Sequence, residues 1–316
     1  MTDLDAHGRR VARLRLELDD EGIWVPEDAD LCELLLVELD YARHPHAHEG
    51  VAPRYGALLS SGVPRTNTVG PLALVDVGDV SLNVVRRLAD GRSSFVVRMP
   101  GAPDRLVCFD RTREYESSAV HLTLGTGALV LQRLGRGWVR LSTPLGVATW
   151  DGMHWATKQL SVNIAERVAP TLARADPTVL ANLLEVCTHW LAAGRVGATL
   201  VWSLDGDPAE LGHLGVAPAV AIPQLDLTSR AHFAPLLNAL AQYDRAGLVD
   251  PGGRISTVGV HLRSSEASRR DLAPFRGTRH TAALRFSAEE PTAAVFVVSS
   301  SGALSVFWQG RRLDTD

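Results

Sequence analysis

Short apolar runs alternate with longer segments of helical periodicity through the C-terminal half of the chain, and this alternation restricts the fold most. An apolar run of about four to eight residues between turn residues is long enough only for a buried strand. Such runs predict strands at residues 198–202, 246–249, 255–261, 293–298 and 303–308, and helical spacing predicts helices at 180–191, 232–243 and 278–286. The turns at 250–253 and 299–302 are short enough to join antiparallel neighbours. We therefore expect an α/β fold with a mixed β-sheet flanked by helices.

The N-terminal half has a different pattern. Residues 72–147 contain short apolar runs separated by turn residues, many of them glycine, which is typical of strands and tight turns. Leucines 31, 34, 35 and 39 share one face of a helix over residues 30–41, and a second helix is expected from about residue 155 towards 173. This half is predicted to be a mainly β domain with flanking helices.

The chain has 316 residues, which favours two domains over one. Asp176 and Pro177 are suited to the N-cap and first turn of a helix, so a new folding unit is expected to begin close to them. We expect one domain over residues 1–170 and a second over 171–316.

Composition excludes several classes of function. Hydrophobic residues make up 46% of the chain and charged residues 22%, which is typical of globular proteins and not of disordered ones. The formal net charge of −4 gives no field that would attract nucleic acid or an anionic membrane, so neither is expected as a partner. The N-terminus is charged, no apolar run is long enough to span a bilayer, and the three cysteines form no Cys-x-x-Cys pair. We expect a cytoplasmic protein with free thiols.

The segment from Gly277 to Leu284, GTRHTAAL, combines features of a phosphate site. A glycine-led turn into a helix presents backbone N–H groups and the positive end of the helix dipole to an anion. Arg279 adds a planar guanidinium suited to phosphate oxygens, and His280 adds a hydrogen-bond donor or a metal ligand. An ordinary junction between a loop and a helix, with a surface arginine, explains these eight residues equally well.

Asp244 offers a carboxylate at the junction of a predicted helix and strand. Phosphoryl transfer from ATP needs a divalent metal to offset the charge of the triphosphate, and an aspartate with a histidine can supply ligands or accept a proton. Considered alone, Asp244 is more simply a turn residue.

Taken in order, these segments resemble the diadenylate cyclase family, also called the DAC or DisA N-terminal domain family. Residues 197–201 match the family's first strand, of the type G-A-L-I-V, residues 244–246 its D-G-A motif, and residues 277–283 its G-T-R-H-R-A-A motif. Val298-Ser299 and the strand up to Gly310 match its last hairpin. The resemblance covers roughly residues 197–310, with five elements in the same order.

The resemblance implies an activity and roles for individual residues. Each family domain binds one ATP, and two domains meet face to face, as a homodimer or a larger homo-oligomer, so that each ribose 3′-hydroxyl attacks the α-phosphate of the other nucleotide. It implies that Asp244 is a ligand of Mg²⁺ or Mn²⁺ or the base for the hydroxyl, that His280 is a metal ligand, and that Arg279 clamps the triphosphate. Further nucleotide contacts are expected from Gly277, Thr278, Ser299 and Ala246.

Two departures from the family pattern fall at the site itself. Arg245 stands where D-G-A has glycine, and Thr281 stands where R-H-R has its second arginine. The first replaces a residue with no side chain by a long cation, which either obstructs the nucleotide or adds a phosphate contact. The second removes a positive charge. A nucleotide-binding module without catalytic activity therefore remains as an alternative to an active cyclase. A structural interaction protein whose C-terminal fold has lost its ligand is a further alternative.

The N-terminal half contains no catalytic motif. Alternate histidines in the segment 44–49, HPHAHE, are a candidate transition-metal site, although a polar loop explains them more simply. Trp138, Trp150 and Trp155 are expected in a core or an interface. Because cyclases of this family commonly carry an additional N-terminal region, we expect residues 1–170 to be a sensor or regulatory domain whose ligand the sequence does not identify.

Overall fold

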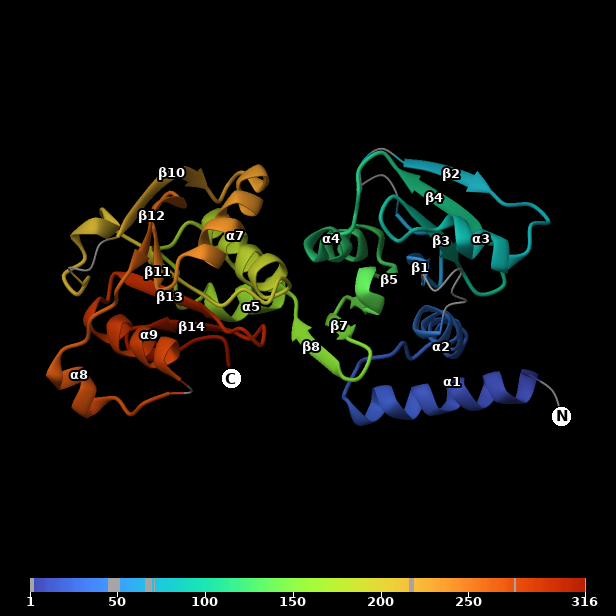
Figure 1. The fold of residues 1–316 in the computed structure, drawn as a ribbon, viewed down its shortest axis with the longest axis horizontal. Helices are drawn as coiled ribbons and strands as arrows, with labels where there is room; N and C mark the ends of the chain where they lie inside the picture. The colour runs from blue at the N-terminus through green and yellow to red at the C-terminus, as the bar shows by residue number, and fades with distance from the viewer. Residues whose placement is uncertain are drawn as a thin grey trace. The chain divides into compact units, whose positions relative to one another are not determined.

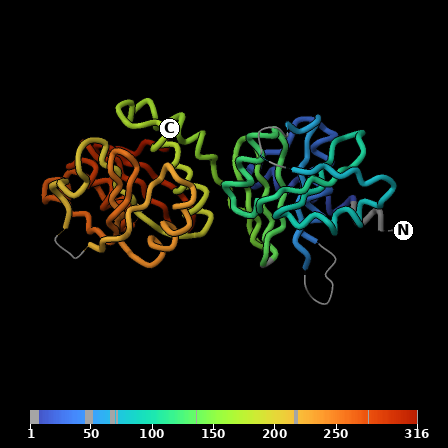
Figure 2. Tube along the Cα trace, turned by 90° about the horizontal axis from the view of Figure 1, so that it is seen from above, coloured from blue at the N-terminus to red at the C-terminus, as the bar shows by residue number. Residues whose placement is uncertain are grey.

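The computed structural model describes residues 3–44, 52–65, 70, 72–215, 219–275 and 277–315. The chain forms two compact units, Met1–Leu160 and Ser161–Asp316, and completes the first before it begins the second (Figures 1 and 2). Helix α5 (Ser161–Val168) belongs to the second unit because Ile164 and Val168 pack into its core. The units thus divide ahead of α5, and the predicted domain boundary at residue 170 follows it.

The first unit is built on an eight-stranded sheet with the order β2-β4-β3-β1-β5-β6-β7-β8. Strands β1 and β3 are parallel, and the other neighbours are antiparallel. The strands are β1 (Tyr55–Leu59), β2 (Leu72–Asp76), β3 (Ser94–Arg98), β4 (Arg105–Phe109), β5 (Leu129–Arg133), β6 (Val139–Thr143), β7 (Gly146–Trp150) and β8 (Trp155–Gln159). The N-terminal part is therefore strand-rich, as its short apolar runs predict.

Helices cover both faces of this sheet. Helices α1 (Asp3–Asp20), α2 (Ala29–Arg43) and α3 (Leu82–Leu88) pack on one face, where Leu18, Leu35 and Val85 join one core. Helix α4 (Glu116–Thr126) packs on the other face through residues such as Leu122. Helices α3 and α4 interrupt the stretch expected to be mainly β. Gly127, which the sequence pattern places in a turn between strands, is the left-handed C-cap of α4.

The second unit contains a seven-stranded mixed sheet with the order β10-β12-β11-β9-β13-β14-β15. Strands β9 and β11 are parallel, and the remaining neighbours are antiparallel. The strands are β9 (Ala198–Ser203), β10 (Val220–Asp226), β11 (Ala246–Val249), β12 (Arg254–Val260), β13 (Ala293–Val298), β14 (Leu304–Trp308) and β15 (Arg311–Arg312). This arrangement confirms the predicted mixed sheet with flanking helices.

The sheet of the second unit lies between two helical layers (Figure 1). Helices α5, α6 (Pro177–Glu185) and α7 (Phe233–Gln242) share a core with one face of the sheet, to which Trp202 and Phe296 contribute. Helix α9 (Thr278–Glu289), with the short helix α8 (Glu266–Asp271) beside it, covers the opposite face through Ala283 and Phe286. This second layer brings the N-terminus of α9 to the end of the sheet where β9 and β11 begin.

Three segments differ from the sequence-based expectation. Residues 155–159 form strand β8, and α5 follows as a separate helix, so the single helix expected from 155 to 173 is wrong. Strand β10 covers part of the predicted loop 205–223. Helix α6 continues into a π-helical turn over Val186–Leu191, within the one helix that the leucine spacing predicts.

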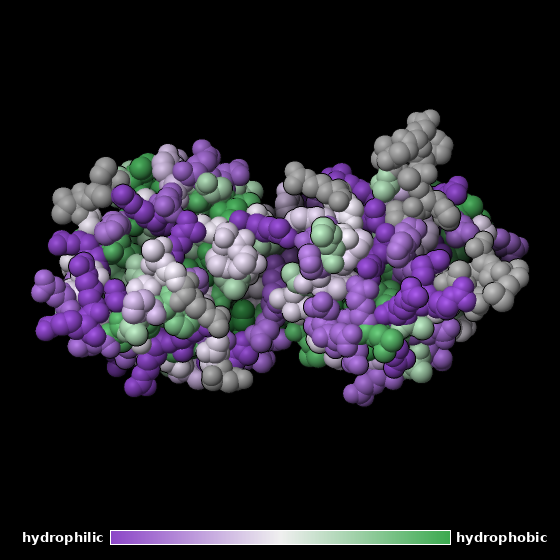
Figure 3. Space-filling model, turned by 60° about the horizontal axis from the view of Figure 1, so that its bottom comes forward, coloured by the Kyte–Doolittle hydropathy of each residue, from purple (hydrophilic) through white to green (hydrophobic). Residues whose placement is uncertain are grey.

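Hydrophilic side chains dominate the face drawn in Figure 3, with hydrophobic ones in patches between them. None of the helices in the described parts of the chain combines the length and the hydropathy that a membrane span requires.

Candidate active site

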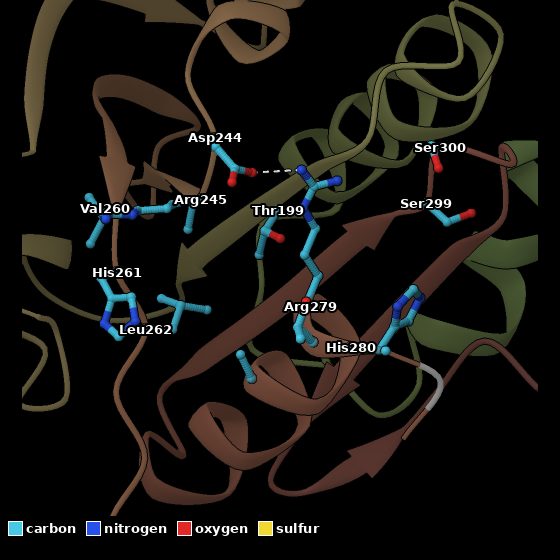
Figure 4. Close-up of a pocket in the computed structure, with 14 residues that line it drawn as sticks. Thr199, Asp244, Arg245, Val260, His261, Leu262, Arg279, His280, Ser299 and Ser300 are labelled. Carbon is cyan, nitrogen blue, oxygen red and sulfur yellow. Dashed lines mark hydrogen bonds and ion pairs between the residues drawn. The ribbon is translucent and has the colours of Figure 1, made fainter. Parts of the chain in front are cut away.

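A pocket of about 480 Å³ lies at the end of the second unit's sheet (Figure 4). Strands β9 and β11, the end of β12, the N-terminus of α9 and the β13–β14 turn surround it. All the residues predicted for the site line it, namely Asp244, Ala246, Gly277, Thr278, Arg279, His280 and Ser299. Thr199, Arg245, Val260, His261, Leu262, Ala282 and Ser300 complete the lining. The fold thus brings segments that are far apart in the sequence into one cavity.

Asp244 and Arg279 form an ion pair across this pocket. Asp244 lies between α7 and β11, Arg279 lies in the first turn of α9, and Arg279 Nη2 donates to Asp244 Oδ1 at 2.6 Å. The Asp244 side chain is 78% exposed and that of Arg279 is 40% exposed, so both can be reached by a ligand. The hydrogen bond from Arg279, followed by that from the backbone N–H of Arg245, lowers the pKa of the Asp244 carboxyl below its usual value. Asp244 is therefore an anion at neutral pH.

Gly197 provides the space that the Arg279 guanidinium occupies. A Cβ atom at Gly197 would overlap Arg279 Nη1 and would lie 3.3 Å from the backbone nitrogen of Ser300. Gly197 directly precedes β9, and it is the first residue of the segment that matches the family's G-A-L-I-V strand. The absence of a side chain at this position therefore sets where Arg279 can lie.

The N-terminus of α9 opens onto the pocket. Gly277, its N-cap, has φ 103° and ψ 169°, a backbone region that essentially only glycine adopts. The first N–H groups of a helix have no partner within the helix, and the helix dipole places partial positive charge there. Gly277, Thr278 and Arg279 thus form a turn that is suited to a phosphate group.

Thr281 holds the loop ahead of α9 together. Its hydroxyl accepts the backbone N–H of Phe275 at 3.0 Å and lies 2.9 Å and 2.8 Å from the carbonyl oxygens of Phe275 and Gly277. The residue that replaces the second arginine of the family motif therefore contacts the loop's own backbone.

Arg245 has a strained backbone. Its φ of 78° lies in the left-handed region, which costs a residue with a side chain roughly 1–2 kcal/mol. The family motif has glycine here, which adopts this conformation without that cost. The Arg245 side chain is exposed, and within the described part of the chain it has no hydrogen-bond or ion-pair partner.

His280 lies on the aromatic side of the pocket. Its ring centroid is 6.1 Å from that of Phe275 and 6.2 Å from that of Phe307, and in the view of Figure 4 the Arg279 side chain lies between His280 and Asp244. No group of three or more potential ligand side chains occurs among the residues that the structure describes. The donor set therefore does not resemble an all-protein metal cage. One exposed carboxylate fits a magnesium-type ion that shares its ligands with nucleotide phosphates.

Several pocket residues were not predicted from the sequence. Thr199 lies on β9 and is almost fully buried, and its position as a polar residue in an apolar strand is the one pattern that marks it. Val260 and Leu262 contribute an apolar wall, which strand periodicity alone does not distinguish from core. The hydroxyl of Ser299, which was predicted, accepts a hydrogen bond from the Ala303 N–H within the β13–β14 turn and shares another with Ser301 Oγ.

The candidate metal segment of the N-terminal half falls mostly outside the described residues, which omit 45–51. His44 is described, and its Nδ1 lies 3.1 Å from Asp40 Oδ1. Trp150 and Trp155 pack within the first unit, where the Arg43 guanidinium lies 4.4 Å and 5.8 Å from their ring centroids. These two tryptophans thus contribute to packing, as expected.

Two family models match the chain, and together they account for most of its length. Residues 187–312 match a nucleotide-binding family described as "DisA bacterial checkpoint controller nucleotide-binding", abbreviated DAC. Residues 12–158 match a family described as "Probable sensor domain DACNK". The first match contains every residue of the pocket, and the second lies within the first compact unit.

Solved structures show more distant similarity. The crystal structure of a double mutant of DacA from Staphylococcus aureus is 20% identical, with a TM-score of 0.33, over 43% of this chain and 85% of that one. A hypothetical membrane spanning protein from Bacillus cereus is 21% identical, with a TM-score of 0.32, over 49% of this chain and 79% of that one. No curated protein matches the chain.

Proposed function

We propose that this chain, which belongs to the DAC family of nucleotide-binding domains and carries a DACNK sensor domain, condenses two ATP molecules into cyclic di-AMP or a related cyclic dinucleotide. One observation carries the proposal. Asp244 and Arg279, 35 positions apart in the sequence, are paired at 2.6 Å in the pocket that every predicted site residue lines.

The proposed role of Arg279 is to bind the triphosphate together with the backbone N–H groups at the start of α9. Gly277 and Thr278 contribute to the same turn, and Ser299 approaches it from the β13–β14 turn. Ala246, with the apolar wall of Val260 and Leu262, offers surface for the nucleoside. A bound triphosphate competes with Asp244 for the guanidinium of Arg279, so nucleotide binding releases the carboxylate for its own role.

Asp244 is the proposed acceptor for the proton of the ribose 3′-hydroxyl. In each half-reaction the 3′-oxygen of one ATP forms a bond to the α-phosphorus of the other, and the bond from that phosphorus to the oxygen bridging the α- and β-phosphates breaks. Pyrophosphate leaves, and the hydroxyl proton passes to the carboxylate. A second half-reaction closes the ring, so two domains must meet face to face, and an isolated monomer is inactive.

Mg²⁺ or Mn²⁺ is the proposed cofactor, held by Asp244 and nucleotide phosphate oxygens, with His280 as a further candidate ligand. When bound, the ion neutralises charge on the phosphates. The first unit is proposed to regulate turnover in response to a ligand.

A second candidate function is nucleotide binding without turnover. The two positions that depart from the family motifs favour it. Arg245 adds an exposed cation next to Asp244, and the Thr281 hydroxyl contacts the loop backbone where the family motif has an arginine. In this alternative the same pocket reports the presence of ATP or a dinucleotide to the first unit.

Incubation of the purified chain with ATP and either Mg²⁺ or Mn²⁺, followed by chromatography, separates these functions. We expect a cyclic dinucleotide from the wild type and none from Asp244→Asn, whereas Arg270→Ala on α8, outside the pocket, serves as the matched control and retains activity. Binding of ATP without any product under either metal would leave only the second function. Loss of both binding and product would exclude both.

A further inference from the structure

Arg245 has three properties that together indicate a ligand-binding role. It directly follows Asp244, its backbone is held in the left-handed region, and its exposed guanidinium has no hydrogen-bond or ion-pair partner among the described residues. Backbone strain of this kind persists where the surrounding structure enforces it and is concentrated at functional sites. An arginine that is exposed, strained and without a partner at the edge of a pocket is suited to bind an anion from outside the chain.

The direction of the side chain distinguishes Arg245 from Arg279. Figure 4 shows Arg279 reaching Asp244 from the side of α9, whereas Arg245 extends away from Arg279 towards Val260 and His261. The turn at the N-terminus of α9, which is suited to a triphosphate, lies on the side of Arg279. Arg245 is therefore directed away from the phosphates of a nucleotide held by its own domain.

Charge leads to the same conclusion. The pocket lining contains one carboxylate, Asp244, and two arginines, Arg245 and Arg279. The positive charge of Arg245 acts on Asp244 and contributes to lowering the pKa of its carboxyl, but the lining has no second carboxylate, so one carboxylate faces two cations. The face around Arg245 thus keeps a positive charge that a phosphate would neutralise.

We propose that Arg245 binds a phosphate of the nucleotide carried by a second copy of the chain. This inference rests on the proposed function, in which the hydroxyl activated by Asp244 attacks the α-phosphate of the partner's ATP. That phosphate must lie in line with the hydroxyl, and so close to Asp244 and to the residue that follows it. Arg245 donates hydrogen bonds to non-bridging oxygens, forms no covalent bond, and stabilises the charge that develops as pyrophosphate leaves.

Separate measurements of binding and turnover test this role. The ligand for binding is 3′-deoxy-ATP, which lacks the attacking hydroxyl, at protein concentrations where sedimentation shows a monomer. We expect Arg245→Ala to bind it within about twofold of the wild type and to lose roughly a hundredfold or more in turnover of ATP, as expected when a trans-acting arginine is removed. Arg279→Ala should weaken binding itself, and Arg270→Ala should change neither quantity. Arg245→Lys should retain part of the turnover, because it keeps the charge but not the planar fork.

Sedimentation with 3′-deoxy-ATP tests the trans contact without any turnover. The wild type and Arg270→Glu should self-associate when the nucleotide is added, and Arg245→Glu should not. If Arg245→Ala binds 3′-deoxy-ATP as weakly as Arg279→Ala does, Arg245 contacts the nucleotide of its own domain, and the inference is overturned. Unchanged turnover in Arg245→Ala, or no nucleotide-driven association in the wild type, would also overturn it. Association without any product would retain the contact and reject the cyclase.

Discussion

Gly197 controls the position of a side chain 82 residues later in the sequence, Arg279, because a Cβ atom there would overlap the guanidinium. The group that must move most is the end of a flexible side chain, so Gly197→Ala should leave the fold intact and displace the Arg279 guanidinium from the position in which it is proposed to bind the triphosphate. We expect affinity for 3′-deoxy-ATP to fall by about tenfold, since a hydrogen bond to a charged group contributes roughly 1.5–3 kcal/mol. Calorimetric titration measures this.

The control for Gly197→Ala is Gly252→Ala in the β11–β12 turn, where a Cβ atom would lie 3.4 Å from Asp250 Oδ1, an ordinary contact. This variant should bind as the wild type does. Equal affinities for the two variants would show that the space at Gly197 does not position Arg279.

Arg245→Gly is expected to separate stability from function. Glycine adopts a φ of 78° without strain, but it also increases the entropy of the unfolded chain, so the free energy of unfolding should rise by at most about 1 kcal/mol. Turnover should fall as in Arg245→Ala. Chemical denaturation together with the ATP assay measures both quantities, and a clear loss of stability would show that the left-handed backbone is not strained.

At the level of single residues, the sequence predicts what a motif contains and not what lies against it. Asp244, Arg279 and Gly277 were identified because they occur in short segments with recognisable order. Thr199 and the role of Gly197 were not, because each depends on which side chain of another segment packs over it. The roles assigned to all of the predicted site residues remain predictions.

Among the elements, the start of α9 is the one on which the proposed phosphate binding depends most. Thr281→Val keeps the side-chain volume but removes the hydroxyl that contacts the backbone of Phe275 and Gly277. We expect the free energy of unfolding to fall by about 1 kcal/mol and the affinity for 3′-deoxy-ATP to decrease. Denaturation and titration measure the two effects. Thr281→Ser keeps the hydroxyl and should retain both the stability and the affinity of the wild type. Unchanged affinity in Thr281→Val would contradict the claim that this loop supports nucleotide binding.

Strands were predicted where the sequence has a clear apolar run, as in the fully buried β9 and β13, and missed where it does not. Strand β10 lies at the edge of its sheet with several exposed residues and contains Pro223, so its sequence resembles a loop. Strand β8 is also an edge strand. Because several of its residues are exposed, it has no apolar run, and the sequence pattern assigned it to a helix. Strands β8 and β10 thus bury too little surface to leave a clear apolar run.

On the scale of the whole molecule, each unit has its own hydrophobic core, so damage to one should leave the other folded. Gly91 has φ 66°, and a Cβ atom there would overlap the carbonyl group of Tyr55, which cannot move aside as a side chain can. Gly91→Ala should destabilise the first unit by at least about 2 kcal/mol. Calorimetry should show a lowered transition for that unit only, with binding of 3′-deoxy-ATP retained.

Gly101→Ala is the matched control, since Gly101 has φ 69° but open space around its Cβ position, and only the conformational strain should remain. Equal destabilisation by the two variants, or loss of nucleotide binding in Gly91→Ala, would contradict independent cores.

The two-part organisation follows from length and pattern, but the ligand of the first unit does not. Its sequence contains no motif that specifies chemistry, and the one conspicuous histidine segment lies mostly outside the described residues. The sequence does not predict the proposed face-to-face assembly either, because such a contact depends on a surface and not on a periodic pattern. These properties of the whole molecule rest on the proposed function.

The stoichiometry of pyrophosphate and cyclic dinucleotide, measured together during incubation of the whole chain with ATP and Mg²⁺ or Mn²⁺, tests the central claim most directly. Two α-phosphorus bonds break for each ring closed, so we predict two pyrophosphates for every cyclic dinucleotide, and neither product from Asp244→Asn. Release of inorganic phosphate without a dinucleotide, or the same product yield from Asp244→Asn, would contradict the claim that Asp244 and Arg279 form the active site of a cyclase.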